Sequence, residues 1–306
     1  MILWFREKLK TLIRLGFYCL GSLGSGSKIP VLMYHSIDDT QSMISVSPQV
    51  FRKHLQYFKD RGYEAVSLEE YFNTAPSQTS KKVLITFDDG YQNLYSHALP
   101  ILKEFSYKAT VFLVTDCVGK NAEWIIRDQK FILKKIVARL TLSKEEKEAQ
   151  VQNLKEISQF KLLSWDEVRE MKNHGFEFQS HSHTHPFVSE ISGDDVKFEL
   201  EQSKSILEKN LNQKVSSFGY PYTDYDNPQI MGLLKETDYR GAFIGDQFPC
   251  ERNKNSEYLI TRIPLWEKNT RFDLTFALSP GYTWYKTCLQ KVRGLKGGNV
   301  RSSAGY

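Results

Sequence analysis

The chain is poor in cysteine. Its 306 residues include only Cys19, Cys117, Cys250 and Cys288, with no C-x-x-C pair and no regular spacing. A disulfide framework and a cysteine-rich zinc knuckle are therefore not indicated, and a reducing compartment is favoured.

Long apolar runs and a glycine-rich phosphate motif are also missing. The uncharged stretch after Arg14 is short and interrupted by glycines, which makes a poor secretory signal and a worse membrane span. No G-x-G-x-x-G follows the first apolar run, so an open dinucleotide-binding sheet is disfavoured.

Acidic residues are scarce at both ends of the chain. The net charge is +5, but residues 1–28 carry +4 and residues 286–306 carry +5, which leaves about −4 for the middle. A body of this charge is not typical of a protein that binds nucleic acid. The basic ends fit an anionic membrane surface, or else are two solvated tails.

Residues 1–28 have the pattern of a basic amphipathic helix. Large apolar residues share one face and basic residues line the face beside it; the apolar set is Ile2, Phe5, Leu9, Leu12, Ile13 and Leu20. This is typical of a helix lying in a membrane interface. A helix packed on the protein's own body is the equal alternative, and a weak signal or anchor is the third. We expect a cytoplasmic protein, peripheral to the inner face of the membrane, with export or membrane anchoring as the alternative.

From residue 29 onward, short apolar runs alternate with amphipathic stretches. This alternation is typical of parallel β/α units, and seven or eight of them favour an α/β barrel in a single domain. Strands are predicted at 29–34, 65–68, 82–87, 109–114, 176–179, 216–220, 239–244 and 258–263. Helices are predicted at 47–62, 91–105, 164–174, 193–212 and 227–236. Ser47 and Ser164 are the expected N-caps.

The body of the protein is predicted to span residues 29–285, followed by a basic C-terminal tail at 286–306. Residues 121–163 interrupt the β/α rhythm with a polar, helix-prone insertion that is rich in Lys and Glu. The sequence does not decide whether this insertion is a lid over the site or a decoration of the surface.

In a parallel barrel the chemistry lies at the carboxyl ends of the strands. The stretch LITFDDG places Asp88 and Asp89 at the end of an apolar strand. Asp and Gly are common wherever a strand enters a turn. Two adjacent buried carboxylates nevertheless repel each other, and a cation or a shared proton relieves that cost. A metal ligand beside a general base is one arrangement that uses both.

The stretch QSHSHTHP, residues 179–186, holds three of the seven histidines at alternate positions. In an extended strand His181 and His185 lie roughly 13 Å apart, so only His183 with one of its neighbours would share an ion. On a helical turn, positions i and i+4 stack on one face, so His181 and His185 bind together and His183 points elsewhere. We favour the turn, although Pro186 prevents a long helix.

Asp89, His181 and His185 then form a donor set suited to zinc or a related divalent ion. A solvated histidine loop is the plain alternative. Among the other histidines, His54 and His97 fall inside predicted helices and His174 at a helix end, where solvated or capping histidines are ordinary.

Three motifs together resemble those of the polysaccharide deacetylases, the NodB-like carbohydrate esterase family. They are TFDDG (86–90), H-S-x-x-H (181–185) and FGYPYTDYD (218–226), in the family's order, and the resemblance spans roughly residues 30–265. It implies a distorted (β/α)7-type barrel and metal-dependent removal of N-acetyl groups from amino sugars. It also implies that Asp88 is the catalytic base and that Tyr222 offers its backbone N–H to the oxyanion. The metal ligands that it implies are Asp89, His181 and His185.

Two departures from the family pattern concern the remaining catalytic groups. Many members have an arginine shortly before the proline of the third motif, and this chain has none there; Arg262 is our candidate for orienting Asp88. No histidine follows His185, so the late general acid of the family is missing. The stretch PVLMYHSID resembles a permuted branch that includes poly-N-acetylglucosamine deacetylases, in which the histidine matching His35 serves as the acid.

We therefore expect hydrolysis of the N-acetyl group of an amino sugar in a polysaccharide or a lipid-linked glycan. The expected cofactor is a divalent metal ion, zinc first, with Co²⁺, Ni²⁺ and Mn²⁺ as alternatives. The expected partner is an N-acetylated glycan, with Tyr91 and Tyr220 as candidate substrate contacts. The alternatives are a deformylase or deacetylase of a non-polymeric lipid-linked sugar, and a catalytically silent carbohydrate-binding relative.

Overall fold

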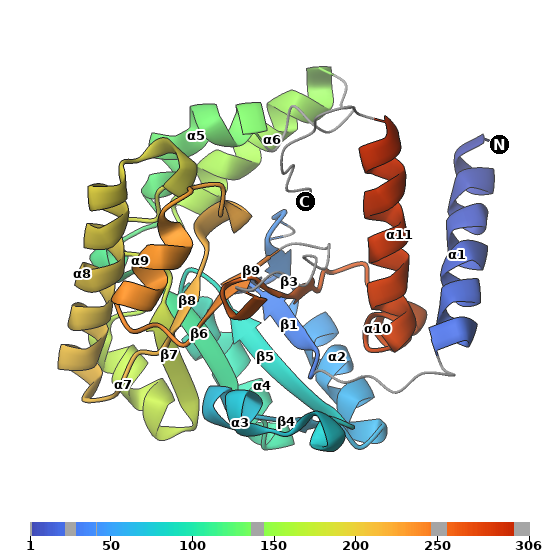
Figure 1. The fold of residues 1–306 in the computed structure, drawn as a ribbon, viewed down its shortest axis with the longest axis horizontal. Helices are drawn as coiled ribbons and strands as arrows, with labels where there is room; N and C mark the ends of the chain where they lie inside the picture. Colours follow the sequence, from blue (N-terminus) through green and yellow to red (C-terminus); the bar gives the residue numbers. More distant parts are fainter. Residues whose placement is uncertain (1, 22–28, 41, 136–143, 246–255, 297–306) are drawn as a thin grey trace.

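The computed structural model describes residues 2–21, 29–40, 42–135, 144–245 and 256–296. Parallel strands form a barrel-like sheet with helices around it, as predicted (Figure 1). The main path runs β10-β9-β8-β7-β6-β5-β1-β11. Its strands are β1 (Val31–Tyr34), β5 (Lys82–Phe87), β6 (Ala109–Leu113), β7 (Phe176–Ser180), β8 (Ser217–Gly219), β9 (Gly241–Ile244), β10 (Ile260–Thr261) and β11 (Ile263–Pro264). Off this path, β4 (Glu64–Ala65) pairs with β5, and β2 (Ser36–Ile37) pairs with β3 (Ser45–Val46).

One short extended segment brings the two ends of the sheet together. β10 pairs with β9, and β11, which follows after a single residue, pairs with β1. That residue is Arg262, whose backbone N–H donates to Ile244 O at 3.0 Å. The predicted strand 258–263 is thus divided between two neighbours, and the sheet forms a distorted seven-stranded barrel.

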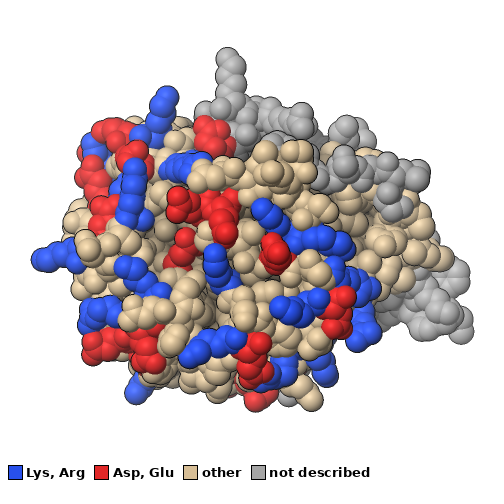
Figure 2. Space-filling model, turned by 90° about the horizontal axis from the view of Figure 1, so that it is seen from below, with Lys and Arg blue, Asp and Glu red and all other residues tan. Residues whose placement is uncertain are grey.

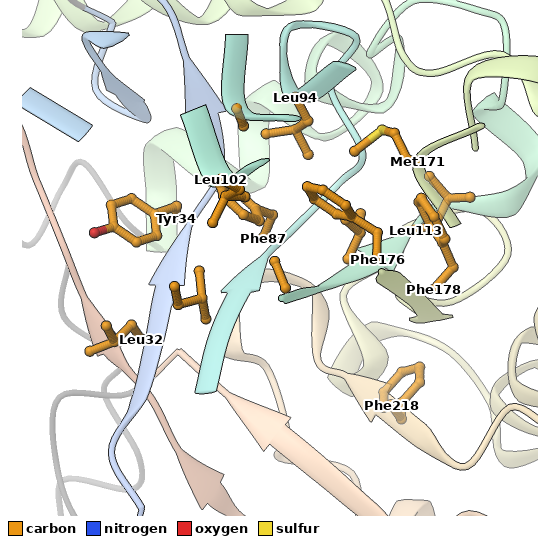
Figure 3. Packing of buried hydrophobic residues seen from close by; sticks show 14 of the residues in the cluster. Leu32, Tyr34, Phe87, Leu94, Leu102, Leu113, Met171, Phe176, Phe178 and Phe218 are labelled. Carbon is orange, nitrogen blue, oxygen red and sulfur yellow. The ribbon is translucent and has the colours of Figure 1, made fainter. Parts of the chain in front are cut away.

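Alternate residues of the strands face the helices or the barrel interior. On β5, Ile85 and Phe87 belong to the large apolar cluster shared with the helices, whereas Leu84 belongs to a smaller cluster formed with other strands and α3. Figure 3 shows part of the large cluster, which gathers side chains of β1, β5, β6, β7 and β8 with those of neighbouring helices. Because the alternation continues past the strand, Asp88 lies on the same side as Leu84 and Thr86.

Two of the helices around the barrel begin at their predicted N-caps. α2 (Pro48–Asp60) follows the N-cap Ser47, and α7 (Trp165–Asn173) begins with a capping box of Ser164 and Glu167. The other helices beside the main strands are α3 (Leu68–Asn73), α4 (Leu99–Phe105), α8 (Gly193–Leu211) and α9 (Ile230–Glu236).

Three local predictions are wrong. The strand predicted at 65–68 ends at Ala65, because Ser67 caps α3. The helix predicted at 91–105 starts with a wider π-helical turn, Leu94–Ala98, before α4; Pro100 lacks the N–H that a regular α-helix would need there. His54 is only 2% exposed, because α2 turns it toward Tyr34, whose hydroxyl lies 3.1 Å from His54 Nδ1.

The insertion forms two helices, α5 (Trp124–Lys135) and α6 (Lys144–Ser158). They lie across the end of the barrel toward which the strands point (Figure 1). Backbone hydrogen bonds tie the insertion's end to the loop after β5: Leu163 N donates to Gly90 O at 2.9 Å, and Gln92 N donates to Lys161 O at 2.8 Å. The insertion therefore covers the strand ends and is more than a surface decoration.

Three helices stand beside the barrel on its other flank (Figure 1). α10 (Arg271–Ala277) and α11 (Pro280–Lys296) were not predicted, and α11 runs through position 286, where a basic tail was expected to begin. α1 (Ile2–Gly21) lies along α11 in close contact: a Cβ placed on Gly281 would come within 2.0 Å of Phe17 O. None of the described helices is long and apolar enough to cross a membrane.

The face shown in Figure 2 carries basic and acidic side chains next to each other. Ion pairs such as Arg169 with Asp166 and Lys214 with Asp238 tie opposite charges together on the surface of the barrel domain. Exposed pairs of this kind add little stability. A polyanion approaching this face would meet carboxylates as well as cations.

Candidate active site and metal centre

Asp88 and Asp89 reach the same cavity because the backbone turns sharply between them. Asp89 has a φ of 70° and Gly90 a φ of 87°, values that place both residues in the left-handed region. A Cβ on Gly90 would lie 2.1 Å from Leu113 Cδ1, so only glycine fits beside β6. The DDG motif thus presents two adjacent carboxylates to one cavity.

His181 and His185 come together as predicted, but not on a helical turn. Residues 181–185 form a bend in which Ser182 and His185 have φ of 68° and 60°. The prediction of a helical turn is wrong, because side chains satisfy this backbone instead. Glu199 accepts hydrogen bonds from the N–H groups of His183 and Thr184 at 2.7 and 2.8 Å, and Ser182 Oγ accepts one from His185 N at 2.9 Å.

The Nε2 atoms of His181 and His185 face Asp89 Oδ1 at 3.4 and 3.2 Å. One donor atom from each of these three buried residues lies within 4.8 Å of the other two. Asp89 Oδ1 is buried, yet no described group gives it a well-formed hydrogen bond. A buried carboxylate oxygen in this state, beside two imidazole nitrogens, fits a zinc-type divalent ion.

The outer partners of the two histidines differ. His181 Nδ1 lies 2.8 Å from Gly219 O, the contact that fixes the ring so that Nε2 faces the site. His185 has no such bond at Nδ1 among the described residues, and is held by packing, with Trp124 and Tyr222 at ring distances of 4.9 and 4.5 Å. His183 turns away, with Nδ1 2.9 Å from Thr115 Oγ1, so it is not part of the group.

Electrostatics in this group follow from burial and close charges. Burial raises the pKa of Asp89, but the two imidazoles beside it outweigh burial and hold that pKa well below its ordinary value. Burial lowers the pKa of both histidines. For His181 the carboxylates of Asp88 and Asp89 outweigh burial, so its pKa is raised. For His185 burial prevails over the Asp89 carboxylate, so its pKa is lowered. Asp89 is therefore ionised and His185 neutral at pH 7, the forms in which both bind a metal.

Arg262 holds Asp88 from inside the barrel. Its Nη1 and Nη2 donate to Asp88 Oδ1 and Oδ2 at 2.5 and 2.6 Å, and both residues are nearly fully buried. Burial raises the pKa of Asp88, but the Arg262 guanidinium, together with His181 and His35, outweighs burial and keeps this pKa below its ordinary value. The geometry brings Arg262 to Asp88 as the sequence predicted.

His35 lies directly after β1 and beside Asp88. Its Nε2 is 4.0 Å from Asp88 Oδ2, and it lines the same cavity. Burial lowers the pKa of His35, while the carboxylates of Asp88 and Asp89 act in the opposite direction. An imidazole at this distance is close enough to exchange a proton with groups bound beside Asp88.

The three predicted tyrosines all line the cavity. Tyr222 has a φ of 54°, and its hydroxyl donates to Asp128 Oδ2 at 3.0 Å, which fixes the loop after β8. Tyr220 is 1% exposed and donates to Tyr258 O at 3.1 Å, while Tyr91 is fully buried with its ring 5.7 Å from Phe160. The side chains of Tyr91 and Tyr220 are therefore part of the cavity wall and do not offer an open face on which a sugar ring could stack.

Several residues that support the site carried no signal in the sequence. On α5, Arg127 donates to the carbonyls of Thr184 and His185 at 2.9 Å and pairs with Asp128. Glu199 in the middle of α8 holds the histidine loop. None belongs to a recognisable motif, because each is placed by how the insertion and α8 fold onto the barrel.

The comparisons with known proteins agree with this geometry. A family profile described as polysaccharide deacetylase matches residues 75–242. The chain is 26% identical over 240 residues to a putative polysaccharide deacetylase of Bacillus subtilis, YxkH, covering 78% of this chain and 71% of that protein. It is 25% identical over 230 residues to poly-beta-1,6-N-acetyl-D-glucosamine N-deacetylase of Staphylococcus aureus, covering 72% of this chain and 67% of the relative.

Among solved structures, the Streptococcus pyogenes deacetylase PplD, in complex with acetate, superposes with a TM-score of 0.63. It is 26% identical and covers 83% of this chain and 99% of its own. A polysaccharide deacetylase of Bacillus cereus, at 23% identity and a TM-score of 0.62 over 82% of this chain and 69% of its own, shares the fold. The chain belongs to the polysaccharide deacetylase family and is a hydrolase of carbon–nitrogen amide bonds.

Proposed function

We propose that this protein removes the N-acetyl group from an amino sugar in a glycan, with a divalent metal ion, zinc first, held by Asp89, His181 and His185. The observation that carries this proposal is the pairing of Asp88 with Arg262 directly beside the metal group, with His35 on the same cavity. The Staphylococcus aureus relatives, which bear the name of an amino-sugar N-deacetylase, support the choice of substrate.

The residues divide the work of amide hydrolysis among them. A divalent ion supplies Lewis-acid polarisation of the carbonyl and makes water more acidic. Asp88, kept ionised and in one orientation by Arg262, accepts the proton of the attacking water. The Tyr222 backbone N–H donates to the oxyanion, and His35 in its protonated form gives a proton to the departing amine.

The direct test is acetate release from an N-acetylglucosamine oligosaccharide. The protein should release acetate, lose this activity in a chelator and regain it when Zn²⁺, Co²⁺, Ni²⁺ or Mn²⁺ is restored. His35→Ala should abolish turnover while metal content stays near one ion per chain. Wild-type activity in His35→Ala would show that another group is the acid, and chelator-resistant release would refute the metal site. A silent carbohydrate-binding relative would bind the oligosaccharide and release no acetate.

We also propose that α1 attaches the protein to the inner face of a membrane from the cytoplasm. Its inward face packs on α10 and α11, where Arg14 pairs with Asp273 at 2.5 Å and Phe17 contacts the ring of Tyr285 at 5.6 Å. Among the side chains of α1 that the structure describes, residues 11–21, several large apolar ones are exposed: Leu12 65% and Leu20 56%, together with Ile13 and Leu15. An apolar face turned to water in this way supports burial in a lipid interface.

The sequences of α1 and α11 are basic. Together they contain eight basic residues and one acid, Glu7; of the basic residues, Arg14 pairs with Asp273 and Lys286 is buried. Basic residues beside an apolar face are attracted to anionic lipid, by about 1 kcal/mol for each residue near the surface. The thiols of Cys117 and Cys288, which are not joined in a disulfide, are compatible with a reducing compartment.

A further inference from the structure

The cavity at the metal group extends into an apolar chamber beneath the insertion. The cavity has a volume of about 290 Å³; Asp88, Asp89 and three histidines line its metal end, and it is also lined by Tyr91, Tyr220, Tyr222 and Thr223. Among the described residues, the wall supplied by α5 and α6 is hydrocarbon and indole: Trp124, Ile125, Ile132, Leu154 and Ile157. Each of these side chains is 8% exposed or less.

Such a wall is a poor partner for a sugar ring. A hydroxyl that is buried without a hydrogen-bond partner costs about 1–3 kcal/mol, and the five side chains of this wall offer only the indole N–H of Trp124. A hydrocarbon chain, in contrast, gains about 0.8 kcal/mol for every methylene that leaves water. The chamber therefore matches an alkyl group better than a second sugar.

The position of the chamber identifies the part of the substrate that enters it. Trp124 packs on His185, with ring centroids 4.9 Å apart, whereas Asp88 and His35 lie toward β1. When the amine departs toward His35, the alkyl substituent of the scissile carbonyl faces His185 and Trp124. A lipid at the anomeric carbon starts on the sugar carbon next to the one that carries the amide nitrogen, whereas the acyl chain starts at the scissile carbonyl itself, so the acyl chain is the group nearest the chamber.

We propose that the chamber binds an N-acyl chain longer than acetyl, so that the preferred substrate is an amino sugar with an N-acyl chain of about four to six carbons. A methylene group occupies roughly the volume of a water molecule, about 30 Å³, so 290 Å³ holds the amide and several methylenes. The proposal rests on the hydrolase function proposed above. The C–N bond breaks, the oxygen of water bonds to the carbonyl carbon, the amine takes the proton, and a short-chain carboxylate is released.

The test is a chain-length series on the metal-loaded, full-length protein. Glucosamine disaccharides carrying N-acetyl, N-butanoyl or N-hexanoyl groups are compared by the rate of free-amine release. We expect kcat/KM to rise about four-fold for each methylene until the chamber is filled. Fastest hydrolysis of the acetyl compound would overturn the chamber assignment and leave the deacetylase function standing. No hydrolysis of any of the three would overturn both proposals.

A second comparison places the alkyl chain on the anomeric carbon instead of the amide. An N-acetyl disaccharide with an octyl group at the anomeric carbon should be hydrolysed at the rate of the plain N-acetyl disaccharide. An increase like that expected for N-hexanoyl would assign the chamber to a lipid aglycone and overturn the acyl assignment.

Two neighbouring isoleucines of α5 provide a matched pair of variants. Ile125 lines the chamber at 8% exposure, while Ile126 is 47% exposed. Ile125→Phe should lower the ratio of hexanoyl to acetyl turnover at least about five-fold, because overpacking costs about 1–3 kcal/mol. Ile126→Phe should leave the ratio unchanged. Equal ratios in both variants would overturn the proposal. Ile157→Ala enlarges the chamber and should shift the best-hydrolysed acyl group to a longer chain. This variant tests the proposal if Ile125→Phe does not fold.

Discussion

The guanidinium of Arg262 donates one hydrogen bond to each carboxylate oxygen of Asp88, at 2.5 and 2.6 Å, in the interior of the barrel. The two residues are 174 positions apart in the chain, and Arg262 occupies the single position between β10 and β11. The residue that joins the two ends of the sheet is thus also the residue that positions the predicted base.

Replacing Arg262 by Gln should lower kcat about 100-fold, because a misplaced base reacts poorly. The acidic limb of the kcat/KM profile should move to higher pH, since Asp88 loses the charge that holds its pKa down and must stay ionised to act. In Arg262→Lys the acidic limb should return to the wild-type pH while kcat stays low, because lysine keeps the positive charge but cannot make two parallel hydrogen bonds to the carboxylate. An unchanged pH profile in Arg262→Gln would contradict this role.

The three histidines of the bend offer a test within five residues. His181→Ala and His185→Ala should each weaken zinc binding at least about 100-fold, because each removes one of three ligands. His183→Ala should bind zinc as the wild type does, since its ring contacts Thr115 and Phe198 instead. Competition with a chromophoric chelator measures all three. Zinc binding lost in His183→Ala and retained in His185→Ala would reverse the assignment.

Sequence reasoning reached the ligands but not the conformation that presents them. Spacing paired His181 with His185, and the structure does bring the two together at Asp89, yet the bend is held by Glu199, which lies outside any motif, and by Ser182. The same limit applies to Arg127 and Asp128, whose roles depend on the docking of the insertion. Local patterns predict strands and caps because their causes are local, whereas support for a site comes from contacts between distant segments.

His54 should make the protein sensitive to mild acid. Burial lowers its pKa to about 4, so the unfolded chain takes up the proton first as the pH falls below about 6.5. This contribution to stability is fully present above pH 6.5, and between pH 7.5 and 4.5 the residue should cost about 2–3 kcal/mol of unfolding free energy. His54→Gln should reduce the difference between urea unfolding at the two pH values by that amount; an equal difference in both proteins would contradict it.

The outward face of α1 should control membrane binding. Leu12→Glu with Leu20→Glu should weaken binding to vesicles containing phosphatidylglycerol at least ten-fold, since each leucine contributes about 1.5–3 kcal/mol on burial. Ile126→Glu, an exposed isoleucine on α5, is the control and should bind normally. If the double variant bound vesicles as well as the wild type does, the exposed leucines would not be a lipid contact. If the wild-type protein were a dimer and the double variant a monomer, the face would be a dimer interface.

The central claim is that two adjacent carboxylates have different tasks, Asp88 in proton transfer and Asp89 in holding the metal. Metal content and acetate release measured on the same preparations of Asp88→Asn and Asp89→Asn test it most directly. Asp88→Asn should keep about one ion per chain and lose turnover by at least about 100-fold, whereas Asp89→Asn should lose the ion along with the activity. An Asp88→Asn protein that has lost its metal, or that still releases acetate at the wild-type rate, would contradict the account.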